Sequence, residues 1–184
     1  MANEIVLTDG TIRVRPCRSS DAEAIYAAVR ESIAELSRWA PWCPPDYSML
    51  HCRPWLESRA AAWAQGLEFD FAVLDESDNS LLGGCALNDI NRTHNFANLG
   101  YWVRTSRAGQ GIATAAARLM AKFGFVELGF TRLEIVVAVG NTASQRVAEK
   151  VGATREGIER NRHVVHGRIH GAVMYSLIPN DLKT

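Results

Sequence analysis

The sequence contains no apolar run of membrane-spanning length and no excess of charge of either sign. Twenty basic residues balance twenty acidic residues among 184, so a general affinity for nucleic acid or for anionic membranes is not expected. The first ten residues lack the basic start and the long apolar core of a signal peptide. These absences favour a cytoplasmic protein that binds neither membranes nor nucleic acid directly.

Cysteine is also scarce, and its pattern is not that of a disulfide-bonded protein. The four cysteines form no C-x-x-C pair and follow no regular spacing; they are Cys17, Cys43, Cys52 and Cys85. A disulfide framework is therefore not expected, and reduced thiols are the default. The sequence has no internal repeat or linker, and its length suits one α/β domain, which we place at residues 1–184.

The stretch from Leu99 to Ala117 is the most informative part of the chain. An aromatic and β-branched run predicts a strand, two closely spaced glycines predict a turn, and apolar residues at helical spacing predict a helix. Strand, turn and helix together direct backbone N–H groups and the positive end of a helix dipole at one point, which suits a phosphate or pyrophosphate. A tight connection that binds nothing would explain the two glycines alone equally well.

The loop Gly109-Gln110-Gly111-Ile112-Ala113 matches neither a Walker loop nor the dinucleotide fingerprint. It resembles the G-x-G-x-G/A loop with which the GNAT superfamily of N-acetyltransferases binds the pyrophosphate of acetyl-coenzyme A. That family has Gln or Arg three residues before the central glycine. Ala108 occupies this position here, and Arg107 precedes it.

Residues 141–152 form a second informative stretch. Ser144 is in line with apolar residues at i+3, i+4 and i+7, which predicts a helix that ends at Gly152. A hydroxyl bonded to a nearby carbonyl, or acting as a cap, would explain the serine. The spelling Asn-x-x-Ser-x-x-Val-Ala-x-Lys-x-Gly nevertheless resembles the second coenzyme A motif of the ribosomal-protein N-terminal acetyltransferase branch of the same superfamily.

This second resemblance implies that Asn141 contacts the pantetheine arm and that Ser144 lies beside the thioester sulfur. Many GNAT enzymes carry a tyrosine acid one turn further along this helix. Ala148 stands there instead, so Ser144 is the candidate for the group that assists the leaving thiolate.

The first half of the chain predicts two helices separated by a proline-rich loop. Residues 20–23 have the pattern of a capping box, the first helix continues to about Leu36, and the second runs from about Met49 to Trp63. Trp39 and Trp42 lie in the loop. They either fill the seam between the helices and the sheet or line an acceptor pocket. The spelling Leu36-x-x-Trp39-x-Pro41-Trp42 resembles the same acetyltransferase branch, which supports the second interpretation.

The remaining pattern predicts strands in a mixed α/β sheet. An edge strand near residues 12–15 is followed by three short-looped strands in an antiparallel meander, and the helix after Gly111 then requires a parallel pair with residues 132–139. A terminal hairpin is expected at 153–177. The GNAT resemblance implies that the parallel strands splay apart around the pantetheine arm, with helices on both faces of the sheet.

The resemblance implies acetyl transfer from acetyl-coenzyme A to an amine in a ternary complex. The predicted donor-binding residues are Tyr101, Trp102, Val103, Arg107, Gly109, Gln110, Gly111, Ile112, Ala113, Asn141 and Ser144. For the general base, Glu68 and Asp70 share one strand face, and two neighbouring carboxylates can raise one pKa toward neutrality. The pattern is explained equally well if Glu68 and Asp70 are solvent-exposed charges at the edge of the sheet.

The acceptor is left open between three alternatives. The leading alternative is the N-terminal α-amine of a protein of the ribosomal type. The second is a small amine such as a polyamine, amino acid or antibiotic. The third is a coenzyme-A-binding module without turnover. No metal is expected, because the spacing of His163, His166 and His170 suits a helix rather than a hairpin. Whether the protein forms a homodimer is left open as well.

Overall fold

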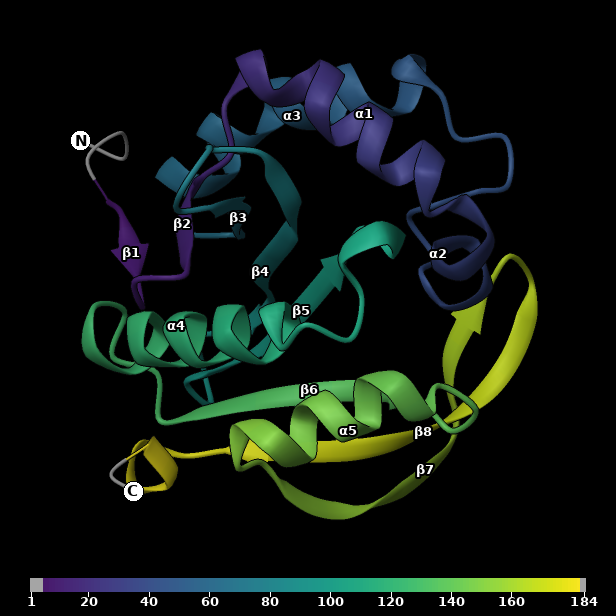
Figure 1. The fold of residues 1–184 in the computed structure, drawn as a ribbon. Helices are drawn as coiled ribbons and strands as arrows, with labels where there is room; N and C mark the ends of the chain where they lie inside the picture. The colour runs from purple at the N-terminus through teal and green to yellow at the C-terminus, as the bar shows by residue number, and fades with distance from the viewer. Residues whose placement is uncertain (1–4, 183–184) are drawn as a thin grey trace.

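The computed structural model describes residues 5–182, so the ends of the predicted 1–184 domain lie outside the described range. Eight strands of the described residues form one mixed sheet in the order β1-β2-β3-β4-β5-β6-β8-β7 (Figure 1). The strands are β1 (Leu7–Thr8), β2 (Ile12–Pro16), β3 (Phe69–Asp75), β4 (Leu81–Asn91), β5 (Phe96–Val103), β6 (Arg132–Ala138), β7 (Thr154–Val165) and β8 (Arg168–Leu177).

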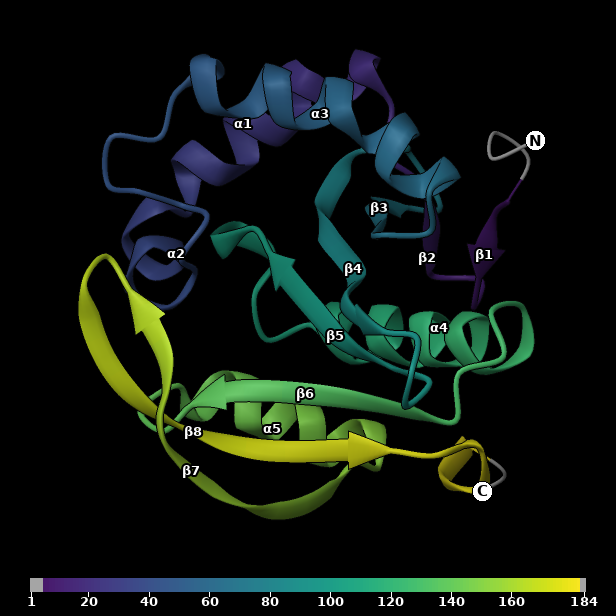
Figure 2. The ribbon, with the colours of Figure 1, turned by 180° about the vertical axis from the view of Figure 1, so that it is seen from behind.

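Helices cover both faces of this sheet, as the resemblance implied (Figures 1 and 2). The α-helices are α1 (Ala22–Glu31), α2 (Ile33–Trp39), α3 (Met49–Ala64), α4 (Ile112–Val126) and α5 (Thr142–Val151). Two separate clusters of buried side chains result, one under α1 and α3 and the other under α4 and α5. Within residues 5–182, no helix is both long enough and apolar enough to cross a membrane.

Strand pairing assigns the side chains of the meander to these two faces. Phe71 and Cys85 are paired, Cys85 is paired with Tyr101, and all three lie against the α4 side. The neighbouring row, which contains Ala72, Gly84 and Trp102, lies on the face covered by α1 and α3, because successive side chains of a strand alternate. The side chains of Tyr101 and Trp102 therefore lie on opposite faces of the sheet.

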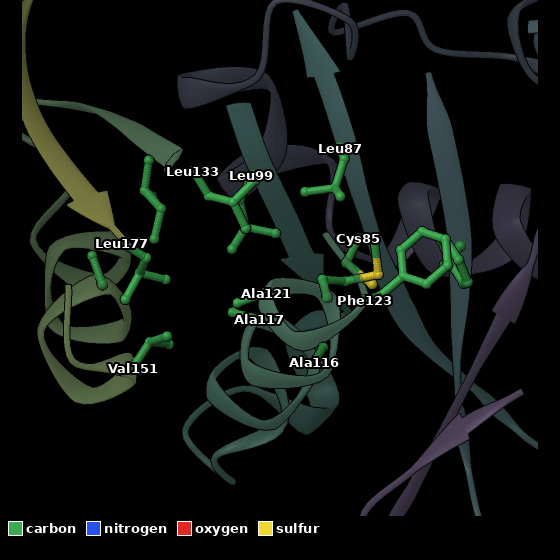
Figure 3. Close-up of a cluster of buried hydrophobic side chains, with 14 of the residues drawn as sticks. Cys85, Leu87, Leu99, Ala116, Ala117, Ala121, Phe123, Leu133, Val151 and Leu177 are labelled. Atoms are coloured by element: carbon green, nitrogen blue, oxygen red, sulfur yellow. The ribbon is translucent and has the colours of Figure 1, made fainter. Parts of the chain in front are cut away.

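Helix α4 packs closely on the sheet because its inner surface consists of small residues. Figure 3 shows Ala116, Ala117 and Ala121 turned toward the side chains of the strands. At Gly124 an added Cβ would lie 3.0 Å from Leu87 Cδ1, a tight contact in a close-packed interior. This packing fixes the start of α4, where the glycine turn lies, relative to β5.

The first predicted helix was wrong in two details. It is interrupted at Ser32, whose buried hydroxyl donates to the Ala28 carbonyl at 2.8 Å and divides α1 from α2. The predicted capping box at 20–23 is not formed. The Asp21 carboxylate instead accepts from the Arg15 guanidinium at 2.7 and 2.8 Å and from the Arg18 N–H at 2.8 Å, across a short 3-10 turn.

The antiparallel meander and the parallel crossover are both confirmed. Strands β3, β4 and β5 pair antiparallel, whereas β5 and β6 pair parallel over three residues only, Phe96 to Asn98 with Arg132 to Glu134. Beyond these pairs the two strands diverge toward their carboxyl ends (Figure 2). The divergence leaves one edge of β5 unmatched by β6 from Leu99 onward.

Candidate active site

The glycine turn before α4 has the geometry of an anion site. Gly109 and Gly111 have φ angles of +77° and +82°, and a Cβ added at either would meet no atom within 4 Å. The first bond of the helix runs from the Ala115 N–H to the Gly111 carbonyl at 3.0 Å. Among the described residues, none accepts a hydrogen bond from the N–H groups of residues 109–114. Free donors and open space together fit a pyrophosphate.

Helices α1 and α2 hold the segment that leads into this turn. The Glu31 carboxylate accepts from the Arg104 guanidinium and from the Ser106 N–H at 2.8 Å, and the Ser32 hydroxyl accepts from the Thr105 N–H at 2.9 Å. The Arg104 side chain and the Ser106 N–H lower the pKa of Glu31 to about 2. The sequence analysis missed these contacts because polar residues on a helix surface give no periodic signal.

Arg107 lies beside the turn, and its guanidinium is paired with an acidic side chain. Its Nη2 atom is 3.4 Å from the Asp75 carboxylate at the end of β3. Arg107, Gln110, Gly111 and Ile112 line a hollow of about 320 Å³ next to the turn. The structure thus groups these predicted donor-binding residues around one opening.

The divergence between β5 and β6 is bridged by a pair of hydroxyl groups. The Tyr101 hydroxyl on β5 donates to the Ser144 carbonyl at 3.0 Å, and the Ser144 hydroxyl on α5 donates to the Tyr101 oxygen at 3.2 Å. The Ser144 N–H is capped by the Asn141 side chain at 3.1 Å, so Asn141 is the N-cap of α5. The Ser144 side chain therefore points to Tyr101 rather than capping its own helix.

Trp39 and Trp42 lie at the carboxyl ends of the diverging strands. Trp39, predicted in the loop, is instead the last residue of α2, and only Trp42 lies in the loop. Trp42 is 48% exposed, and its ring centroid is 6.0 Å from that of Trp102 near the end of β5. The Trp39 ring lies over Gly140, just after β6, where an added Cβ would be 2.9 Å from Trp39 Cη2. By contrast, Trp63 packs into an aromatic cluster 4.9 Å from Phe69. The tryptophans thus divide between core and entrance.

The β7–β8 hairpin meets the end of α2 and the loop that follows it (Figures 1 and 2). His163 Nε2 is 2.9 Å from the Trp39 carbonyl oxygen, and His166 Nε2 is 3.1 Å from that of Cys43. The His170 ring is edge-on to Trp39 at 6.3 Å. Over the described range, no three metal-binding side chains are grouped around a common point. These imidazoles contact the entrance loop, a role that the sequence analysis missed.

Glu68 and Asp70 lie apart from Ser144. Both carboxylates contact the guanidinium of Arg59 on α3, at 2.7 Å in the case of Asp70. Pairing aligns Asp70 with Ala86 of β4 and Gly100 of β5, so its side chain is on the α1–α3 face with Trp102. Burial raises the pKa of Asp70, which Arg59 opposes and the Glu68 charge reinforces. The two carboxylates thus share a face with the entrance tryptophans but not with the Tyr101–Ser144 pair.

Comparisons with known proteins agree with this geometry. The model of a family described as acetyltransferase (GNAT) domain matches residues 11–154. The Bacillus subtilis protein YdaF, named provisionally as a ribosomal N-acetyltransferase, is 30% identical over 175 residues, 92% of each chain.

Solved structures give the same picture. A Vibrio cholerae structure, titled provisionally as a ribosomal-protein-serine acetyltransferase, is 28% identical with a TM-score of 0.85 and covers 97% of this chain and 100% of its own. RimL, a ribosomal L7/L12 α-N-protein acetyltransferase solved with coenzyme A, has a TM-score of 0.87 at 23% identity over 95% of this chain and 98% of its own. The RimL likeness is one of fold.

Proposed function

The chain belongs to the GNAT family of acetyltransferases, and we propose that it acetylates the N-terminal α-amine of a protein with acetyl-coenzyme A as donor. Membership rests on the family model, which spans residues 11–154, and on relatives that cover almost the whole chain. The observation that carries the proposed acceptor is the exposed Trp42, which lies with Trp39 at the carboxyl ends of the diverging strands.

The donor fits the groups around the divergence. The free N–H groups of residues 109–114 would hold the pyrophosphate. The unmatched edge of β5 near Tyr101 to Val103 would bind the thioester oxygen and the pantetheine, with Asn141 at the far side. Acetyl-coenzyme A supplies an activated acyl group; the protein supplies orientation and hydrogen bonds.

The chemistry then needs one proton removed from nitrogen and one delivered to sulfur. The amine nitrogen forms a bond to the acetyl carbon as the carbon–sulfur bond breaks, and the products are an amide and a free thiol. We assign the hydrogen bond to the departing sulfur to Ser144. We assign the amine proton to Asp70 through water, because Asp70 lies on the acceptor face two strands from β5, about 10 Å at the usual strand spacing.

Charge favours a peptide over a polyamine as acceptor. A polycation needs free carboxylates, but Glu68 and Asp70 on the acceptor face are both paired with Arg59. The exposed ring of Trp42 suits the end of a polypeptide, whose apolar and backbone groups can pack on it. Two relatives that match at least 92% of this chain, YdaF and the Vibrio cholerae protein, have names that point in the same direction.

An acceptor panel tests this proposal. Release of free thiol from acetyl-coenzyme A is measured with a peptide that has a free N-terminal serine or alanine, with the same peptide blocked at its N-terminus but containing lysine, and with spermidine. We expect turnover with the free N-terminus and an acetyl group at the α-amine by mass spectrometry. Turnover on spermidine or on lysine alone would contradict the proposed acceptor.

A further inference from the structure

The hydroxyl groups of Tyr101 and Ser144 form a reciprocal pair between β5 and α5. Tyr101 donates to the Ser144 carbonyl at 3.0 Å and accepts from the Ser144 hydroxyl at 3.2 Å. These bonds join residues 43 positions apart, at the level where β5 and β6 are no longer paired. The pair is therefore a contact across the site rather than part of a regular element.

Tyr101 suits a role in hydrogen bonding rather than in proton release. Burial raises its pKa to about 12, although the Ser144 hydroxyl opposes this shift. An ordinary thiol has a pKa of about 8.5, so a thiolate is too weak a base to take the proton of this phenol. Tyr101 therefore keeps its proton at neutral pH, and the contacts of its hydroxyl are the two hydrogen bonds to Ser144.

The fold itself does not require this hydroxyl. Helix α5 is capped by Asn141 at its start, ends at Gly152 in the left-handed conformation, and buries Ala148 and Val151. The Tyr101 ring packs against the α4–α5 cluster through its apolar atoms. A phenylalanine would keep that packing and lose only the two hydrogen bonds, so the hydroxyl has a use other than filling the core.

We propose that Tyr101 is a positioning residue that holds Ser144 Oγ beside the departing sulfur. In the structure the single Ser144 hydroxyl proton is donated to Tyr101, so in the reaction it turns to the sulfur while the Tyr101 hydroxyl turns from the Ser144 carbonyl to donate to Ser144 Oγ. This inference rests on the proposed function of Ser144. With Tyr101 in place the serine side chain is held toward the divergence of β5 and β6. Without it the serine hydroxyl can turn to a carbonyl of its own helix, as serines in helices commonly do.

The chain offers a matched control in Tyr175. Its buried ring also sends a hydroxyl to α5, where it donates to the Glu149 carboxylate at 3.2 Å. Loss of that hydroxyl removes a partly buried hydrogen bond to the same helix without touching Ser144. Tyr101→Phe and Tyr175→Phe thus separate orientation of Ser144 from general support of α5.

The experiment compares kcat, the dissociation constant of acetyl-coenzyme A and the melting temperature for the wild type and for the single and double variants at positions 101 and 144. We expect Tyr101→Phe to lower kcat roughly 3- to 10-fold, in the range of one lost hydrogen bond, with donor affinity changed less than ~2-fold. Tyr175→Phe should leave kcat unchanged. The Tyr101→Phe, Ser144→Ala double variant should match Ser144→Ala alone, because Tyr101 acts only through the serine.

Two results for the variants at Tyr101 would overturn the inference. One is additive losses in the double variant, which would mean that Tyr101 acts independently of Ser144. The other is a loss of donor affinity in Tyr101→Phe with kcat unchanged, which would make its hydroxyl a donor contact. Turnover on spermidine instead of the peptide would contradict the proposed acceptor. The inference about Tyr101 would then be tested by measuring the kcat of the same variants with spermidine. A wild-type kcat in Ser144→Ala would overturn the role of Ser144 and this inference with it.

Discussion

The donor end and the acceptor end of this site are built from different parts of the polypeptide. At the proposed donor end the candidate binding groups are backbone N–H groups of residues 109–114, set by two glycines and the start of α4. At the proposed acceptor end they are side chains: Trp39 at the end of α2 and Trp42 on the loop that follows, in contact with the hairpin histidines. One end is fixed by local geometry, whereas the other depends on contacts between distant segments.

This difference predicts different consequences of mutation. A backbone site tolerates most side-chain changes but fails when a Cβ enters its open space. A side-chain site loses specific contacts one residue at a time. Mutations at the two ends should therefore separate donor affinity from acceptor kinetics, and the following variants test how cleanly they do so.

The largest effect is expected for Asp70→Asn, which removes the proposed base. We expect kcat to fall roughly 100-fold, the lower end of general acid–base catalysis, with unchanged donor affinity. Because burial raises the pKa of Asp70, the acidic limb of the wild-type pH profile should vanish in the variant. Glu68→Gln is the control, since it shares Arg59. Equal, small losses of kcat in both variants would contradict the role of Asp70 as base and would mean that the two carboxylates only hold Arg59 of α3.

At the donor end, Gly111→Val should weaken binding of coenzyme A at least ~10-fold, about 1.4 kcal/mol. The new side chain would project into the open space in front of the free N–H groups. Gly129→Val is the matched control, because Gly129 also has a positive φ, +70°, and open space around its Cβ position. Isothermal titration calorimetry measures the affinity of both variants for coenzyme A. Equal losses of affinity would mean that backbone strain, rather than obstruction of the turn, causes the effect.

At the acceptor end, Trp42→Ala should raise the acceptor KM roughly 5-fold, about 1 kcal/mol, or change the preferred acceptor. Donor affinity should stay within ~2-fold, because Trp42 contacts Trp102 and Tyr47 and not the glycine turn. Trp63→Ala serves as the core control and should lower the melting temperature by several degrees. A similar melting loss in Trp42→Ala with normal acceptor kinetics would make Trp42 a packing residue.

The smallest effect is expected for Glu31→Gln, which loosens the connection between the two ends. The folded-state pKa of Glu31 is about 2, below its ordinary 4.5, so this carboxylate stabilises the fold above about pH 4.5 and loses its contribution as the pH falls toward 2. The variant should melt lower than the wild type at pH 7, and the difference should disappear in acid. Glu23→Gln, in an exposed pair with Arg53, is the control. A constant difference at every pH would contradict this account.

The same comparison explains which features could be predicted from sequence. The glycine turn, α4, the parallel crossover and α5 with its Gly152 end depend on local patterns and could be predicted. The division of α1 from α2 could not, because Ser32 is placed by a bond to Thr105 far along the chain. Such a contact has no local pattern.

The acceptor end was predictable only in part. The sequence suggested Trp39 and Trp42 but could not choose between core and entrance, because exposure depends on which segments cover the loop. The pairing of Glu68 and Asp70 with Arg59 on α3 and the contact of Tyr101 with Ser144 also depend on how separate elements pack. Strand alternation could have placed Asp70 and Trp102 on one face once the register was known.

The most direct test of the backbone donor site uses a truncated donor. The affinities of acetyl-coenzyme A and of S-acetylpantetheine, which lacks the pyrophosphate and the nucleotide, are measured for the wild type and for Gly111→Val. If residues 109–114 hold the pyrophosphate, the variant should lose affinity for acetyl-coenzyme A and keep its affinity for S-acetylpantetheine, so that the preference for the full donor falls at least ~10-fold. A parallel loss for both donors, with the preference unchanged, would contradict the assignment of the pyrophosphate to this turn.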